Sequence, residues 1–234
     1  MNLNINTLRI GYDDKELAHI VDLSLQSGEI HYLIGRNGIG KSTLFKTLAG
    51  IVPSIGHTDI QWEGRELDLT LGRDLAHTVS YMHRYPVHSR ITVLEFYQIA
   101  LKQVEGMGIE LRAKLDQAMA LSKRLGIEGL HDRYIPSLSD GEYQKVLITL
   151  CLSRACPIIL LDEPLNHLDP PAQEEMMVLF KEYAREHLLW MSTHFLEKIQ
   201  STKGRTLAIS KENMMISVDN QILSDKVLVA DLYR

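Results

Sequence analysis

The chain has 234 residues, of which 45% are hydrophobic and 24% charged, with a formal net charge of −5. This composition excludes a disordered chain, and the acidic balance argues against the basic domain with which proteins usually grip nucleic acid. The length allows one large domain or two modest ones.

Neither a signal for secretion nor a membrane span is expected. The first fifteen residues lack the basic start and apolar core of a secretory signal. The longest apolar runs, such as Val146 to Leu152, are far shorter than the roughly 18 residues a spanning helix needs. Cys151 and Cys156 share one apolar stretch, which favours buried thiols in a reducing compartment. We therefore expect a soluble, cytoplasmic chain.

Short apolar runs alternate with turns in the first third of the sequence. They predict strands at 3–10, 20–25, 30–34 and 57–61, and a helix at 41–48. A strand is also expected near Tyr81. The segment 92–133 is rich in Leu, Lys and Glu at a spacing near 3.6, which indicates helices joined at Gly106-Met107-Gly108.

Strands and helices alternate again after Pro136. Helices are predicted at 139 to about 155, from 170 onward and at 195–200, with strands at 158–161, 188–191 and 205–210. Such alternation implies an α/β fold with a mostly parallel sheet. The helical segment then reads as an insertion into that sheet.

Residues 35–42 read GRNGIGKS and fit the phosphate-binding pattern G-x-x-x-x-G-K-[ST], between a predicted strand and a predicted helix. Glycines let backbone N–H groups surround phosphate oxygens, and the helix N-terminus adds positive potential. We expect Lys41 to reach the β- and γ-phosphates, Ser42 to bind Mg²⁺ and Thr43 to reach the α-phosphate. The expected nucleotide-contacting residues are Gly35, Arg36, Asn37, Gly38, Ile39, Gly40, Lys41, Ser42 and Thr43.

Two carboxylates follow the apolar run 158–161, at the end of a predicted strand. Taken alone, they read as solvated acids at a strand terminus. With a phosphate-binding loop upstream, Asp162 is expected to hold Mg²⁺ directly or through water. Glu163 is expected to act as general base or to orient the attacking water.

Further motifs, spread over nearly the whole chain, accompany the phosphate-binding loop and the two carboxylates. LSDGEYQK, from Leu138, resembles the signature sequence of ABC transporter ATP-binding subunits, and LNHLD (165–169) resembles their D-loop. His194 matches the switch histidine, and Tyr12 matches the aromatic residue that stacks on adenine. The plain alternatives are a helix cap at Ser139 and Glu142, a packing histidine and a strand-end aromatic.

The resemblance implies a fold and an organisation. It implies a P-loop NTPase of the ABC ATPase type: a mostly parallel sheet core, an antiparallel β subdomain and an inserted helical subdomain. One domain would span 1–234, with the core at about 1–91 and 158–234 and the helical subdomain at about 92–157.

The same resemblance implies cofactors and partners. ATP and Mg²⁺ would bind, and a second copy of the chain would close head to tail over two nucleotides. Ser139, Gly141 and Glu142 would face the ATP of that second copy, while Lys41, Glu163 and His194 would serve hydrolysis. Integral membrane permease subunits would place the chain on the inner face of the cell membrane, with a substrate-binding protein as an indirect partner and no nucleic acid.

Two departures from the family pattern stand out. The family carries a glutamine after the strand near Tyr81, and here Arg84 or His83 takes its place, depending on the direction of counting. Asp140 replaces a glycine of the signature, and a carboxylate near a γ-phosphate is unfavourable unless it points away.

The function expected from these residues is the ATPase subunit of an ABC transporter. The NHLD string and the segment GRDLAHTVSYM resemble importers of iron–siderophore, haem or cobalamin. Alternatives are a soluble ABC ATPase outside transport, as in iron–sulfur assembly, and a hydrolysis-impaired nucleotide switch. A DNA-associated ABC ATPase fits the acidic charge poorly.

Overall fold

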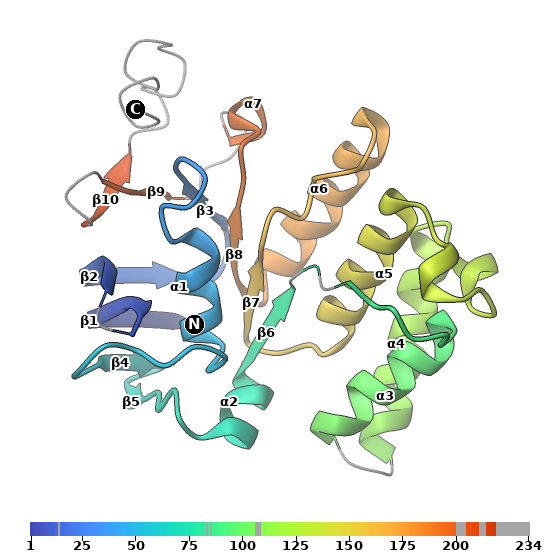
Figure 1. Cartoon of the computed structure of the whole chain (residues 1–234), viewed down its shortest axis with the longest axis horizontal. Coiled ribbons are helices and arrows are strands. Elements are labelled where there is room, and N and C mark those ends of the chain that lie inside the picture. The colour runs from blue at the N-terminus through green and yellow to red at the C-terminus, as the bar shows by residue number, and fades with distance from the viewer. Residues whose placement is uncertain are drawn as a thin grey trace.

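The structure is a computed structural model with two β-sheets, one helix between them and a group of helices on the far side of the larger sheet (Figure 1). It describes residues 1–13, 15–82, 84, 86–105, 109–199, 205–210 and 214–218. The expected turn at 106–108, the residues Tyr85, His83 and Gln200, and the chain beyond 218 lie outside these ranges.

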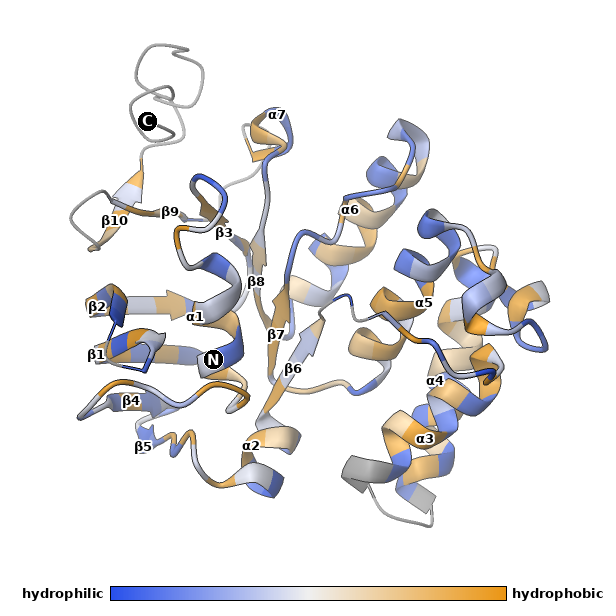
Figure 2. Ribbon diagram, viewed as in Figure 1, coloured by the Kyte–Doolittle hydropathy of each residue, from blue (hydrophilic) through white to orange (hydrophobic). Residues whose placement is uncertain are grey.

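The larger sheet has six strands in the order β10-β9-β3-β8-β7-β6, all parallel except β10. Its strands are β3 (Ile30–Ile34), β6 (Val79–Met82), β7 (Ile158–Leu161), β8 (Leu188–Ser192), β9 (Thr206–Ile209) and β10 (Met215–Val218). β3, β7, β8 and β9 are buried along their whole length, as expected for parallel strands covered on both faces. In Figure 2, β7 and β8 accordingly carry hydrophobic colours.

The smaller sheet is antiparallel, in the order β2-β1-β4-β5. It consists of β1 (Asn2–Tyr12), β2 (Lys15–Gln26), β4 (Asp59–Trp62) and β5 (Arg65–Glu66). β1 and β2 extend further than the runs predicted at 3–10 and 20–25, because one buried face suffices to hold a strand whose other face is polar. This arrangement agrees with the expected antiparallel β subdomain.

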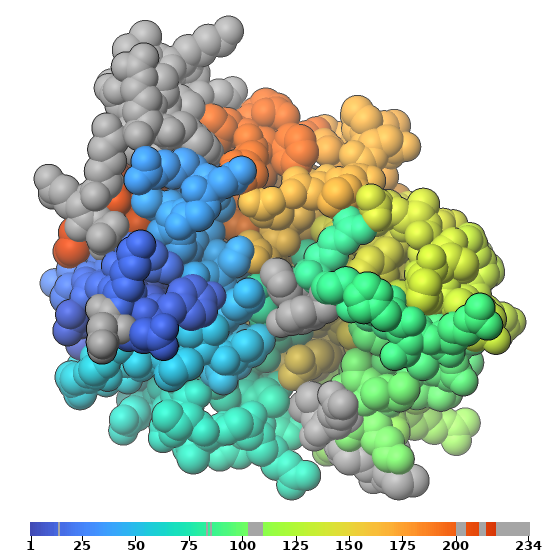
Figure 3. Space-filling model, in the orientation of Figure 1, coloured from blue at the N-terminus to red at the C-terminus, as the bar shows by residue number. Residues whose placement is uncertain are grey.

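Helices pack on both faces of the larger sheet. They are α1 (Lys41–Leu48), α2 (Gly72–Thr78), α3 (Val93–Glu105), α4 (Ile109–Arg124), α5 (Asp140–Ser153), α6 (Pro170–Ala184) and α7 (Leu196–Ile199), with short 3₁₀ turns at Glu128–Leu130 and Ile135–Ser137. α1 lies between the two sheets, where Phe45 meets Trp190 edge to face with ring centroids 5.4 Å apart. α3, α4 and α5 pack together on the opposite side (Figures 1 and 3).

Side-chain alternation along the parallel strands divides the hydrophobic core into two layers. Ile158 and Leu160 of β7 join the layer with α1 and the smaller sheet, whereas Ile159 and Leu161 join the layer with α5 and α6. Successive side chains of a strand point to opposite faces, so one apolar run fills both layers. The prediction of a mostly parallel α/β sheet is confirmed.

Some elements differ from the sequence-based expectations. The helix α2 and the strand β10 were not predicted, since neither has a strong periodic pattern of its own. Both thiols, Cys151 and Cys156, are buried and, in the described part of the chain, neither joins a disulfide. Burial raises the pKa of the Cys151 thiol to about 12. No helix among the described residues is long and apolar enough to cross a membrane.

The packing of α6 against the hydrophobic core can be tested by mutation. Phe180 is fully buried, so Phe180→Ala leaves a cavity and should lower the free energy of unfolding by about 3–5 kcal/mol. The matched control is Val178→Ala on the same helix, because Val178 is 54% exposed and should cost about 0.5 kcal/mol or less. Urea unfolding of both variants measures the difference, and equal losses would contradict this packing.

Candidate functional site

Three neighbouring parallel strands end at one edge of the larger sheet. In the order β3-β8-β7, Leu33 pairs with Ser192 and Met191 pairs with Leu161, so the three carboxyl ends lie level. The phosphate-binding loop follows β3, the residues Asp162 and Glu163 follow β7, and His194 follows β8. Ligands of open α/β sheets bind in the crevice outside such strand ends. The register of these strands therefore brings the predicted site residues to the same edge of the sheet.

The loop between β3 and α1 has the backbone shape that its glycines allow. Gly35 has φ 143° and Gly40, the N-cap of α1, has φ 112°, both in the region that side chains with a Cβ rarely adopt. Arg36, Asn37 and Gly38 are exposed, while Ile39 anchors the loop in the core. The loop thus presents an exposed tip immediately before a helix N-terminus.

Lys41 lies folded back into this loop. Its Nζ donates to the carbonyl oxygens of Gly35 at 2.6 Å and Arg36 at 3.2 Å, and the residue is only 5% exposed. Burial lowers the pKa of Lys41, while the charges of Glu163 and Asp162 oppose that shift. A cation with so little water around it favours an anionic ligand.

Asp162 is held by hydroxyl groups from two strands. Ser192 Oγ donates to its Oδ1 at 2.7 Å, and the Tyr81 hydroxyl donates to its Oδ2 at 3.3 Å. The same Ser192 oxygen accepts the backbone N–H of Glu163 at 2.9 Å. One fully buried serine therefore fixes the positions of both acids.

Glu163 has a carboxylate held on both oxygens. Oε1 lies 2.7 Å from His194 Nε2, and Oε2 accepts from Asn166 Nδ2 at 2.5 Å. Its backbone has φ 50°, an uncommon conformation for a residue with a side chain and one that recurs at functional sites. His194 therefore lies beside Glu163, and its role in hydrolysis stays a prediction.

Ser42, Asp162 and Glu163 line one cavity together with Arg84, Gln144, Asn166 and His167. The hydroxyl of Ser42 and the carboxylate of Asp162 are oxygen donors of the kind Mg²⁺ takes beside nucleotide phosphates. Among the described residues, no group of three or more His, Cys, Asp or Glu side chains is placed to hold a metal ion by itself. A magnesium ion that takes its other ligands from phosphates and water needs no such cluster, so the donor set fits.

Ser139 and Glu142 form the predicted capping box at the start of α5. The Ser139 hydroxyl accepts the Glu142 N–H at 3.3 Å, and Glu142 accepts the Ser139 N–H at 2.7 Å. These hydrogen bonds, with the nearby Arg133, lower the pKa of Glu142. Gly141 packs so closely that an added Cβ would lie 3.0 Å from the carbonyl oxygen of His167.

Tyr12 lies at the end of β1, beside the first turn of α1. Its hydroxyl accepts a hydrogen bond from Thr43 Oγ1 at 3.4 Å, and the residue is 47% exposed. An aromatic ring exposed beside a phosphate-binding loop can stack on a base.

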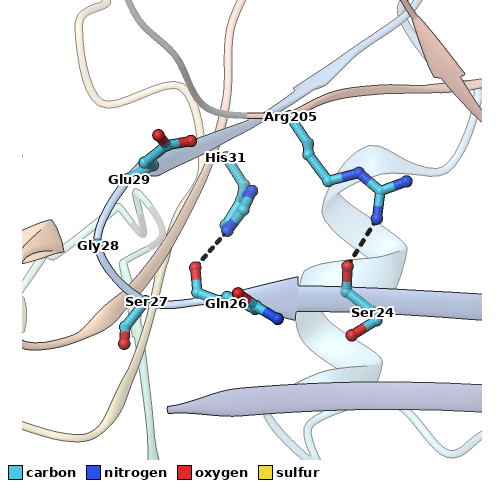
Figure 4. A pocket seen from close by; sticks show the side chains of 7 residues that line it. All are labelled: Ser24, Gln26, Ser27, Gly28, Glu29, His31 and Arg205. Carbon is cyan, nitrogen blue, oxygen red and sulfur yellow. Dashed lines mark hydrogen bonds between the residues drawn. The ribbon is translucent and has the colours of Figure 1, made fainter.

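A separate cavity lies at the other end of β3 (Figure 4). His31, which is buried, bonds the carbonyl oxygen of Gln26 at 2.7 Å, and Arg205 donates to that of Ser24 at 2.8 Å. Both polar groups face backbone carbonyls of β2. The phosphate-binding loop contributes no residue to this cavity.

Comparison with known proteins decides the family. Residues 18–166 match the family described as ABC transporter. The chain belongs to that family. An uncharacterized ABC transporter ATP-binding protein of Haemophilus influenzae is 32% identical over 207 residues, which cover 83% of this chain and 74% of that protein.

Two named relatives are import subunits. The thiamine import ATP-binding protein ThiQ of Histophilus somni is 32% identical, with 88% of this chain and 94% of that protein covered. The nucleoside import ATP-binding protein NupA of Lactococcus lactis is 30% identical over 88% of this chain, but the match covers 40% of that longer protein. The relatives thus share the ATP-binding role but differ in substrate.

Solved structures confirm the fold expected for an ABC ATPase. A nucleotide-free ATP-binding cassette from an ABC transporter superposes with a TM-score of 0.80 and 19% identity, covering 98% of each chain. At this identity the likeness concerns the fold alone. The P-loop α/β fold class predicted from the sequence is therefore correct.

The structure also shows residues beside Asp162 and Glu163 that were not predicted from the sequence. Ser192 and Asn166 orient the two acids, and Gln144 of α5 donates to the carbonyl oxygens of Glu163 and Pro164 at 3.3 and 2.9 Å. Asn166 lies within the motif LNHLD, so the sequence did offer a signal that it belongs to the site. Nothing in the sequence pairs Ser192 or Gln144 with the acids, because both contacts depend on tertiary structure.

Ser192 offers a test of this geometry. Ser192→Ala removes a buried donor to Asp162 and a buried acceptor for Glu163, so it should lower the free energy of unfolding by about 1–3 kcal/mol. Ser153→Ala is the matched control, because Ser153 is equally buried and, within the described part of the chain, its hydroxyl donates to the carbonyl of Leu150 in its own helix and not to either acid. If urea unfolding gives Ser192→Ala the smaller loss, Ser192 does not hold the two acids in place.

Proposed function

We propose that the chain is the ATP-hydrolysing subunit of an ABC importer. The observation that carries this proposal is the position of the Glu163 carboxylate. It is held by His194 and Asn166 in the same cavity as Ser42, the residue that follows the buried Lys41. A fixed carboxylate beside a phosphate site is suited to orient an attacking water.

Each residue of the site has a proposed role. Lys41 exchanges its contacts with loop carbonyls for the β- and γ-phosphates, and the loop N–H groups from Gly35 to Thr43 surround the phosphate oxygens. Ser42 and Asp162 hold Mg²⁺, which would neutralise phosphate charge when bound. His194 keeps Glu163 oriented, and Tyr12 stacks on the adenine.

The proposed partners rest on the resemblance of the sequence at the start of α5 to the ABC signature. Ser139, Gly141 and Glu142 at the start of α5 are proposed to meet the nucleotide of a second copy bound head to tail. The helical subdomain, residues about 92–157, is proposed to dock on integral membrane permease subunits, which hold the chain at the inner face of the membrane. The core would then comprise about 1–91 and 158–234, and a substrate-binding protein would act one step further away.

The relatives supply the support for import and bear on the substrate. Their names give thiamine and nucleosides, so they do not support the expectation of iron–siderophore, haem or cobalamin uptake. We propose import of a small organic solute of this kind. A soluble role in iron–sulfur assembly is not favoured by these relatives, and the intact set of Lys41, Asp162 and Glu163 speaks against a hydrolysis-impaired switch.

Hydrolysis tests the proposal. Glu163→Gln removes the carboxylate that orients water, so the rate of ATP hydrolysis should fall by about 100-fold or more while ATP binding persists. Glu175→Gln, an exposed acid on α6, is the control and should leave the rate unchanged. Phosphate release by the purified chain, with and without its membrane partners, gives the measurement. Equal rates for the natural protein and Glu163→Gln would refute this role.

A further inference from the structure

A second cavity lies at the amino ends of β3 and β9, at the end of the larger sheet opposite the phosphate-binding loop (Figure 4). The turn at 27–29 leads from β2 into β3, where His31 is the second residue. Because β3 and β9 run parallel, the Tyr32 N–H donates to the carbonyl oxygen of Arg205 at 2.9 Å. The pairing of these strands therefore brings His31 and Arg205 to the same end of the sheet.

This cavity has the size and lining of a site for a small polar molecule. Its volume is about 620 Å³, and ligand pockets span roughly 300–1,000 Å³. Glu29, His31 and Arg205 line it together with two serines, a glutamine and a glycine. Among the residues the structure describes, no apolar side chain contributes to this lining. The cavity therefore favours a ligand that forms hydrogen bonds and carries charge.

His31 contributes an acceptor that nothing in the described part of the chain satisfies. The residue is only 3% exposed, and its Nε2 lies 2.7 Å from the carbonyl oxygen of Gln26. A carbonyl oxygen can only accept, so Nε2 carries the hydrogen of this bond. Burial lowers the pKa of His31, which favours a neutral ring with a lone pair on Nδ1. Nδ1 is buried without a hydrogen-bond partner among the described residues, and a donor on a ligand would remove that cost.

Opposite charges lie on the two sides of His31. In Figure 4 its ring stands between Glu29 and Arg205, and the charge of Glu29 raises the pKa of His31 while that of Arg205 lowers it. Both charged side chains are exposed. Among the described residues, Arg205 donates only to the carbonyl oxygen of Ser24, at 2.8 Å. A guanidinium has five donors in a planar fork, so most of this one is available to a carboxylate.

We propose that this cavity binds a free α-amino acid with a polar side chain. The carboxylate of the amino acid pairs with Arg205, and its ammonium group donates to Nδ1 of His31 and faces Glu29. The side chain of the amino acid lies among the serine and glutamine groups of the lining. Since Nδ1 is shielded from water, the ammonium group reaches it after a small shift of the ring.

Ligands of a single charge satisfy only part of this site. An inorganic anion would pair with Arg205, but a neutral His31 ring has no second hydrogen to donate to it. An amine would pair with Glu29 and His31, but it would leave the Arg205 guanidinium without a carboxylate. A zwitterion supplies a partner for all three groups at once.

Calorimetric titration of the full-length chain without nucleotide tests the ligand class. The probes are L-glutamine, glutaramate, which lacks its amino group, and γ-aminobutyramide, which lacks its carboxylate. L-Glutamine should bind saturably, and each analogue should bind about tenfold or more weakly, because each loses one charged hydrogen bond. Absence of saturable L-glutamine binding would overturn the proposal. Equal affinities for L-glutamine and glutaramate would indicate a plain anion site and overturn it too.

Two variants assign the charged groups of the ligand to residues. Arg205→Gln should weaken L-glutamine and glutaramate about tenfold or more and leave γ-aminobutyramide unchanged, because only the first two carry a carboxylate. Glu29→Gln should weaken L-glutamine and γ-aminobutyramide about two- to fivefold and leave glutaramate unchanged. Arg73→Gln and Glu175→Gln are the matched controls, since both residues are exposed and neither lines the cavity. Natural affinity for L-glutamine in Arg205→Gln would overturn the proposal.

The amino-acid site is separate from the nucleotide site. The two cavities are reached from opposite ends of β3 and share no lining residue. L-Glutamine should therefore bind Lys41→Met as tightly as the natural chain, and saturating ATP should not displace it. Displacement by ATP would place the amino acid at the nucleotide site and overturn the proposal. A natural chain that binds L-glutamine but no ATP would contradict the proposed function alone.

Discussion

Parallel pairing of β3, β8 and β7 is the constraint on which the site depends. Because the three strands run the same way and end level, the segments that follow them meet at one edge of the sheet. A slip of register by one residue would turn Ser192 away from the acids and disrupt the strand alternation that fills both core layers. The site and the core are therefore specified by the same pairing.

The charged groups at this edge are held by hydrogen bonds within the chain. Lys41 gives its hydrogens to loop carbonyls, Asp162 takes hydrogen bonds from hydroxyl groups, and Glu163 is flanked by His194 and Asn166. Each group is held by partners weaker than a phosphate or a metal ion. Preorganisation of this kind keeps the geometry of the site while leaving its charges available for exchange.

Most features of the site that could be predicted were indicated by short sequence motifs. GRNGIGKS, the acids after an apolar run and the capping box are each defined within a few residues, so sequence alone located the loop, Asp162, Glu163 and the start of α5. The contact between Arg84 and Asp140 spans 56 positions, and that between Ser192 and Asp162 spans 30. No local pattern encodes such pairs; they follow from strand order and helix placement.

The edge formed by these strands is proposed to bind ATP through the buried ammonium group of Lys41. Calorimetric titration of the full chain and of Lys41→Met with ATP, in the presence of Mg²⁺, measures it most directly. We expect the variant to lose ATP affinity by about tenfold or more, because a charged hydrogen bond to phosphate is lost. Equal affinities of the two proteins for ATP would contradict it.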